Sequence, residues 1–186
     1  MTPNVLCLLF LLMADMSLSA PAKNEDPVKE TANSLETIPR PRIDFGKTNF
    51  EIMISRSRCL SNVGRQNGGQ YISLERPGCV EHGTVQHEVL HALGFHHEQS
   101  RSDRDKYVWI RFQNIEEGAE NQFKKVATHN LGTPYDFFSV MQYEKYAFSK
   151  NKKPTIVAKF DPNFDWGRAY QMSANDIDRV NRLYGC

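Results

Sequence analysis

Two short stretches in the first half of the chain alternate between apolar and polar side chains. Residues 50–54 read Phe-Glu-Ile-Met-Ile, and residues 70–74 read Gln-Tyr-Ile-Ser-Leu. A period of two is typical of a strand with one buried face, so both stretches are predicted as strands. Residues 59–63 are a third, shorter candidate, and the turn-forming run Asn-Gly-Gly at 67–69 precedes the later strand. The pattern predicts a small sheet in this part of the chain.

Farther along, apolar positions recur at helical spacing. A helix is predicted from about Gly83, and its buried side consists of Val85, Val89, Leu90, Ala92 and Leu93. A second helix is predicted from about Asn114, with one apolar face made of Ile115, Ala119, Phe123 and Val126. Residues 107–112 are predicted as extended and residues 128–172 as irregular, because the latter are rich in Gly, Pro, Asn and aromatic side chains.

The end of the chain carries the clearest helix signals. Ser173 is a predicted N-cap, Asp176 follows three residues later, and Gly185 is of the type that ends a helix. Three apolar residues are predicted to point inward: Ile177, Val180 and Leu183.

The helix predicted from Gly83 carries the sequence His87-Glu88-x-x-His91. Residues four apart lie one above the other on a helix, so the two imidazoles can bind one metal ion. Glu88, beside the first of them, is placed to hold a water molecule that the metal activates. These five residues alone fit equally well a helix with two surface histidines.

Two further features favour a metal site. Gly94 is of the type that turns a chain at a helix end, and this turn can bring His97 back as a third ligand. The residues then read His-Glu-x-x-His-x-x-Gly-x-x-His, which is identified as the metzincin signature and is followed in that group by a turn around a methionine. Residues 139–143, Ser-Val-Met-Gln-Tyr, are a candidate for this Met-turn. The sequence therefore predicts one zinc ion bound by His87, His91 and His97.

The N-terminal residues differ in composition from the rest. Residues 5–13 form an apolar run that is too short to cross a bilayer, and small residues follow it. This is typical of a secretory signal peptide, predicted as residues 1–20. Residues 21–42 are polar and contain four prolines, which indicates a pro-segment or linker. Residues 43–186 are then predicted to form one domain of a secreted, extracellular protein.

Charge and cysteine content limit the kinds of binding partner that are expected for this chain. Lys and Arg number 23 against 22 Asp and Glu, so the balance gives no reason to expect nucleic acid or an anionic membrane as a partner. After the signal peptide no stretch is long and apolar enough to span a membrane. Without Cys7 of the signal, an odd number of cysteines remains in an oxidising compartment. Cys59 and Cys79 flank a strand–turn–strand stretch and are the natural pair, which leaves Cys186 available for an intermolecular disulfide.

From Cys59 to Cys186 the chain resembles the astacins, secreted zinc endopeptidases within the metzincins. Residues 83–105, 139–143 and 172–186 carry the resemblance, and the run His-Glu-Gln-x-Arg-x-Asp-Arg-Asp from His97 onward separates astacins from other metzincins. The general similarity is greatest to the fish hatching-enzyme, or choriolysin-like, branch. The resemblance implies an α+β, zincin-like catalytic domain. Its small mixed sheet and zinc-binding helix would lie above a cleft, and its irregular lower half would end in a helix.

The resemblance also implies a role for each matching residue. The metal ligands would be His87, His91 and His97. Glu88 is similar to the family's general base, and Met141 to an apolar floor beneath the metal. Tyr143 is similar to a tyrosine that ligates zinc in the resting enzyme and swings away to stabilise the transition state.

Other matches concern the support of the site. Glu98 is similar to a buried carboxylate that in the family is linked to the N-terminus of the mature enzyme. Cys59 and Cys79 match a family disulfide. The charged residues that follow Glu98 fit surface ion pairs as well as a family-specific role: Arg101, Asp103, Arg104 and Asp105.

The chain departs from the astacin pattern in three places. The strand at residues 50–54 corresponds to about the third strand of the family, so the first two strands and the helix between them are expected to be missing. That segment carries the cysteine that pairs with the C-terminal one, which agrees with an unpaired Cys186. The mature N-terminus of the family is expected to be missing too, so Glu98 is expected to be buried without that partner. Gln142 replaces a histidine of the family's Met-turn, a change expected to be mild.

Two functions follow as hypotheses. The first is a secreted zinc endopeptidase that cleaves protein substrates, with egg-envelope or extracellular-matrix proteins as candidates. The second is a non-catalytic, zinc-binding secreted product of a truncated astacin gene. The complete set of metal ligands with Glu88 and Tyr143 favours the first, because a chain that has lost catalysis tends to lose its base or a ligand. The missing N-terminal segment and the unpaired Cys186 favour the second.

Overall fold

The structure is a computed structural model that describes residues 42–44, 49–55, 58–64, 66, 70–76 and 78–185. The predicted signal peptide, residues 1–20, lies outside the described residues. So do residues 21–41 of the predicted pro-segment, and Cys186 with its predicted intermolecular disulfide. The predictions for these parts of the chain remain predictions.

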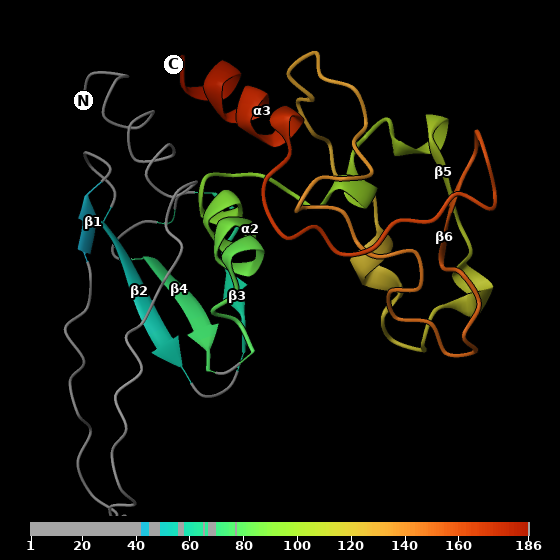
Figure 1. Cartoon of the computed structure of the whole chain (residues 1–186), viewed down its shortest axis with the longest axis horizontal. Helices are drawn as coiled ribbons and strands as arrows, with labels where there is room; N and C mark the ends of the chain where they lie inside the picture. Colours follow the sequence, from blue (N-terminus) through green and yellow to red (C-terminus); the bar gives the residue numbers. More distant parts are fainter. Residues whose placement is uncertain are drawn as a thin grey trace, which may run out of the picture.

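The first half of the described chain contains a mixed sheet (Figure 1). Its strands are β1 (Arg42–Asp44), β2 (Asn49–Ser55), β3 (Leu60–Ser61) and β4 (Gln70–Glu75), in the order β1-β2-β4-β3. β2 and β4 are parallel, whereas β1 and β3 pair antiparallel with their neighbours. Ile72 and Leu74 of β4 are buried while Tyr71 is exposed, which is the alternation that the sequence shows. The three strands predicted in this region are confirmed.

Helix α2 (His82–Ala92) lies between this sheet and the second half of the chain (Figure 1). Val89 and Leu90 of α2 pack with Ile72 and Leu74 in one apolar cluster. The disulfide between Cys59 and Cys79 is present, with the two Cα atoms 5.6 Å apart, and it fastens the segment before β3 to the segment after β4. The predicted helix and the predicted disulfide are therefore found. Among the described helices, none combines the length and the apolar character needed to cross a membrane.

The second half is mostly irregular, as predicted, apart from a two-stranded sheet of β5 (Val108–Ile110) and β6 (Ile156–Ala158). The helix predicted from Asn114 is wrong. Short 3₁₀ turns, Phe112–Asn114 and Glu120–Phe123, lie there instead. Gly118 has a φ of +88°, outside the helical region, and it separates the two turns. Ile115 and Phe123 are nevertheless fully buried, in a second apolar cluster.

The last helix, α3 (Ala174–Tyr184), begins and ends as predicted. Ser173 and Asp176 form a capping box, and Gly185 ends the helix with a φ of +69°. The prediction of its inward face is right for Val180 and wrong for the other two apolar residues. Ile177 is 40% exposed and Leu183 is 46% exposed. The buried face of α3 also contains two charged residues, Asp176 and Arg179, because it contacts an ionic network beside the apolar cluster that holds Val180.

Candidate metal centre

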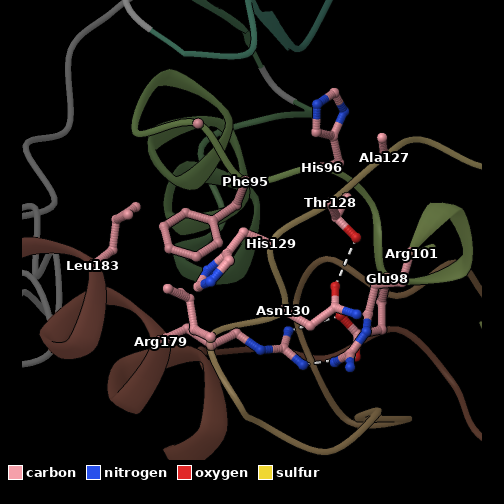
Figure 2. Close-up of a pocket in the computed structure, with 12 residues that line it drawn as sticks. Phe95, His96, Glu98, Arg101, Ala127, Thr128, His129, Asn130, Arg179 and Leu183 are labelled. Atoms are coloured by element: carbon pink, nitrogen blue, oxygen red, sulfur yellow. Dashed lines mark hydrogen bonds and ion pairs between the residues drawn. The ribbon is translucent and has the colours of Figure 1, made fainter. Parts of the chain in front are cut away.

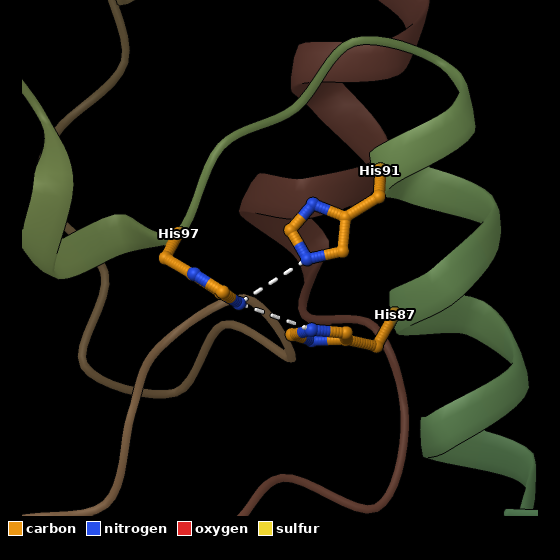
Figure 3. A group of neighbouring side chains, drawn as sticks. All are labelled: His87, His91 and His97. Atoms are coloured by element: carbon orange, nitrogen blue, oxygen red, sulfur yellow. Dashed lines mark hydrogen bonds between the residues drawn. The ribbon is translucent and has the colours of Figure 1, made fainter. Parts of the chain in front are cut away.

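Three histidines predicted as ligands lie together in the structure (Figure 3). His87 and His91 project from one face of α2. Gly94 follows that helix with a φ of +101°, a backbone conformation that favours glycine, and the chain then returns so that His97 faces the helix. One ligand atom from each of the three side chains lies within 4.8 Å of the others.

The ring nitrogens have defined orientations. Nδ1 of His87 donates a hydrogen bond to the carbonyl oxygen of Val140 at 2.7 Å, and Nδ1 of His91 donates one to the carbonyl oxygen of Phe95 at 2.8 Å. A neutral imidazole has one protonated nitrogen, so Nε2 of both rings keeps its lone pair. Nε2 of His97 lies 3.2 Å from Nε2 of His91 and 3.3 Å from Nε2 of His87.

This arrangement fits a zinc ion. Two nitrogens that each lie about 2.05 Å from a tetrahedral zinc are about 3.3 Å from one another, which is the spacing seen here. Burial lowers the pKa of all three histidines, to about 4 for His91 and about 2 for His97, so the rings are neutral at physiological pH. Neutral imidazoles are the form that binds a metal.

Glu88 lies next to these rings with one oxygen free. The residue is 5% exposed, and within the described structure its Oε2 is buried without a hydrogen-bond partner. Burial raises the pKa of its carboxyl to about 7. Glu88, His87 and Tyr143 line the same cavity of about 340 Å³. The carboxylate can therefore accept a proton from a group that enters this cavity.

Tyr143 lies beside the ring of His97. Its ring centre is 4.4 Å from that of His97, and burial raises the pKa of its phenol to about 12. The hydroxyl therefore keeps its proton and can donate a hydrogen bond. Met141 is 1% exposed and packs in the cluster that contains Leu90. Gln142, at the position that departs from the astacin pattern, accepts a hydrogen bond from the hydroxyl of Tyr135 at 2.6 Å.

The surroundings of Glu98 differ from those expected from the sequence. Glu98 is 1% exposed but has charged partners: Arg179 donates to Oε1 and Oε2 at 2.7 Å each, and Arg101 donates to Oε1 at 3.1 Å. The backbone N–H of Asp136 also donates to Oε1, at 2.7 Å. The three charged side chains lie together at a second cavity of about 280 Å³ (Figure 2). Glu98 is buried, as expected, but its charge is not left uncompensated, because Arg179 of α3 pairs with it.

The surface ion-pair interpretation is wrong for the two arginines. Arg101 and Arg104 are each 5% exposed, and Arg104 donates to the carbonyl oxygens of Gln99 and Phe123. Asp103 is half-buried and Asp105 is exposed. The partnership of Glu98 with Arg179 spans 81 residues of sequence, and nothing in the local pattern indicated it. The remaining histidines lie outside the metal cluster: His82, His96 and His129.

The sequence of this chain matches a known protein family and several curated proteins. The family model for Astacin, a peptidase family, matches residues 42–185. The chain belongs to the astacin family. It is 47% identical over 131 residues to the low choriolytic enzyme of Oryzias latipes, a match that covers 70% of this chain and 48% of that protein. It is 44% identical over 152 residues to the zinc metalloproteinase nas-13 of Caenorhabditis elegans, a match that covers 77% of this chain and 33% of that protein.

The fold agrees with the family. High choriolytic enzyme 1, a hatching enzyme zinc-protease from Oryzias latipes, matches with a TM-score of 0.70 and 43% identity. The match covers 74% of this chain and 68% of that structure. The predicted α+β, zincin-like architecture is confirmed by this likeness. The chain spans about half or less of the length of the curated relatives it matches.

Proposed function

We propose that this astacin-family chain is a secreted zinc-dependent endopeptidase that hydrolyses peptide bonds of protein substrates. The observation that carries the proposal is a set of three neutral imidazole rings, with Nε2 of His97 3.2–3.3 Å from Nε2 of the other two. Beside them lies a buried oxygen of Glu88 that has no hydrogen-bond partner among the described residues. His87, His91 and His97 would hold the ion. In the same proposal residues 1–20 are a signal peptide, residues 21–42 a pro-segment, and residues 43–186 the peptidase domain.

The chemistry needs a base and a hydrogen-bond donor on the substrate side of the metal. Zinc, when bound, supplies a Lewis acid that polarises a carbonyl group and lowers the pKa of water. Glu88 takes a proton from the attacking water and passes it to the nitrogen of the leaving amine. The hydroxyl of Tyr143 donates a hydrogen bond to the substrate oxygen that gains negative charge. Both side chains line the cavity of about 340 Å³ in which a peptide bond would lie.

The substrate class rests on the relatives. Three of them are choriolytic enzymes, and the matching structure is that of a hatching enzyme zinc-protease. Proteins of an egg envelope or of the extracellular matrix are therefore the candidates for this chain. An extracellular location follows from the same relatives and from the predicted signal peptide.

The test uses the chain expressed through the secretory pathway and purified with its zinc content measured. Casein cleavage is expected, is expected to stop when a chelator removes the metal, and is expected to return when zinc is added back. Folded protein that holds one zinc per chain and cleaves neither casein nor gelatin would contradict the proposal. That outcome would support the non-catalytic zinc-binding alternative.

A further inference from the structure

The buried face of α3 carries two charged residues that reach toward the metal site. Asp176 is 2% exposed and Arg179 is 6% exposed. Residues three apart lie on the same face of a helix, so both point to the same side. Each of them contacts a segment that carries or supports a metal ligand. None of the three histidines lies on α3 itself.

Arg179 contacts the segment of His97 through Glu98. Its guanidinium forms a bidentate ion pair with the carboxylate of Glu98. Nη1 donates to Oε2 and Nη2 donates to Oε1, both at 2.7 Å. It also donates to the hydroxyl of Thr133 at 2.9 Å and to the carbonyl oxygen of Pro134 at 2.9 Å. Such a planar, buried pair fixes the position of both side chains.

His97 is held differently from the other two ligands. It follows Gly94 on an irregular segment, and within the described structure its Nδ1 makes no hydrogen bond, unlike Nδ1 of His87 and of His91. The backbone next to it is held because Glu98 donates its N–H to the carbonyl oxygen of Met141 at 2.9 Å. The side chain of Glu98 is in turn held by Arg179. The backbone that carries His97 is therefore held through Glu98 and Arg179.

Asp176 contacts the Met-turn, which orients a second ligand. Its Oδ2 accepts a hydrogen bond from the N–H of Val140 at 3.1 Å, and its Oδ1 accepts one from the hydroxyl of Ser139 at 2.6 Å. The carbonyl oxygen of the same Val140 accepts the hydrogen bond from Nδ1 of His87 at 2.7 Å. One peptide segment therefore connects α3 to the ring of His87.

We propose that α3 positions the metal site, with Arg179 setting His97 through Glu98 and Asp176 setting His87 through Val140. This inference rests on the proposed function in so far as the three histidines hold a metal. Arg179 and Asp176 are positioning residues, since neither touches the metal-ligating nitrogens. Groups that orient metal ligands change metal affinity by about 10- to 100-fold when they are removed.

The experiment measures cobalt(II) binding to the metal-free chain, because cobalt(II) replaces zinc in such sites and its visible absorption reports the ligand geometry. The variants are Arg179→Met, Arg179→Lys and Asp176→Asn. The control is Arg182→Met on the same helix, which removes an exposed pair with Asp178 at 2.8 Å. Circular dichroism and urea unfolding of each metal-free variant show that it is folded at the temperature used.

Arg179→Met and Asp176→Asn are expected to lower cobalt affinity, measured against a competing chelator, by about 10-fold or more and to shift the cobalt absorption bands. Arg179→Lys keeps the charge without the bidentate geometry, so its cobalt affinity should lie between those of wild type and Arg179→Met. The control should match wild type. If Arg179→Met does not fold, the two milder variants carry the comparison.

Two results would overturn the inference, and they are distinguishable. Folded variants with wild-type cobalt affinity and wild-type absorption would show that α3 only stabilises the fold. That result leaves the metal site and the proposed function standing. A wild-type chain that is folded but binds no cobalt and no zinc would overturn the proposed function, and this inference with it.

Discussion

Replacement of Arg101 by Met tests whether the charged run after the metal ligands is part of the core. Arg101 is 5% exposed and its guanidinium makes five hydrogen bonds. Two of them go to the carboxylate of Asp103, at 2.9 and 3.0 Å, and one goes to Glu98 at 3.1 Å. The other two go to carbonyl oxygens. Met keeps much of the apolar stem but can donate none of these bonds.

The loss in the free energy of unfolding follows from the hydrogen bonds that each partner of Arg101 keeps in the variant. Removal of one member of a buried ion pair costs about 3–5 kcal/mol when the other is left uncompensated. Glu98 keeps its pair with Arg179, and Asp103, whose side chain is 22% exposed, can be hydrated, so the loss lies at the low end. The carbonyl of Pro134 keeps a donor in Arg179, whereas the carbonyl of Thr133 loses its donor, which costs about 1–3 kcal/mol. The two low-end costs add, so Arg101→Met should lower the free energy of unfolding by about 4 kcal/mol.

Urea unfolding of the metal-free protein measures this loss without a contribution from metal binding. Arg182→Met is the matched control, because its pair with Asp178 joins side chains that are 48% and 45% exposed. Exposed pairs contribute about 0–1 kcal/mol. A loss below about 1 kcal/mol for Arg101→Met, equal to the control, would contradict a core role for this side chain, since Arg101 would then behave as a surface residue.

Three further predictions concern the cleft and the disulfide. Tyr143→Phe keeps the ring and removes the hydroxyl, so kcat for a peptide substrate should fall about 100-fold or more with little change in KM; an unchanged kcat would exclude Tyr143 as the donor. Burial raises the pKa of Glu88 to about 7, and a bound dication lowers it, so kcat/KM should fall as pH drops along an acid limb centred below 7. A rate that rises toward acid pH would contradict this assignment. Replacing Cys59 and Cys79 together by Ser opens a loop with a sequence separation of 20 and should cost about 3 kcal/mol in urea unfolding, whereas a loss within error would show that the bridge is dispensable.

Local patterns predicted the elements whose signals are local. Alternation identified β2 and β4, helical spacing identified α2, and Ser173 with Asp176 marked the start of α3. The helix expected after Asn114 failed because the apolar spacing there serves buried 3₁₀ turns around Gly118 rather than a continuous helix. Periodicity shows that residues are buried on one side, and it does not tell a helix from successive turns.

The metal site likewise has parts that the sequence predicted and parts that it did not. The spacing of His87, His91 and His97 predicted a group that the structure brings within 4.8 Å. The groups that orient it were not predictable, because the carbonyl oxygen of Val140 has no sequence signature and Arg179 lies 81 residues from Glu98. The inward face of α3 was misjudged for the same reason. Its three apolar residues suggested a core contact for all of them, while only Val180 packs in the apolar cluster and the rest of the partner surface is ionic.

The most direct test of the account compares wild type with Glu88→Gln, which keeps the shape of the side chain and removes the base. Zinc content and casein cleavage are measured on the same preparations. One zinc per chain is expected in both proteins, and the cleavage rate is expected to be at least about 100-fold lower in the variant, since a positioned general base contributes about 10²–10⁴-fold. A Glu88→Gln protein that cleaves casein at the wild-type rate would contradict the role of Glu88 as the general base.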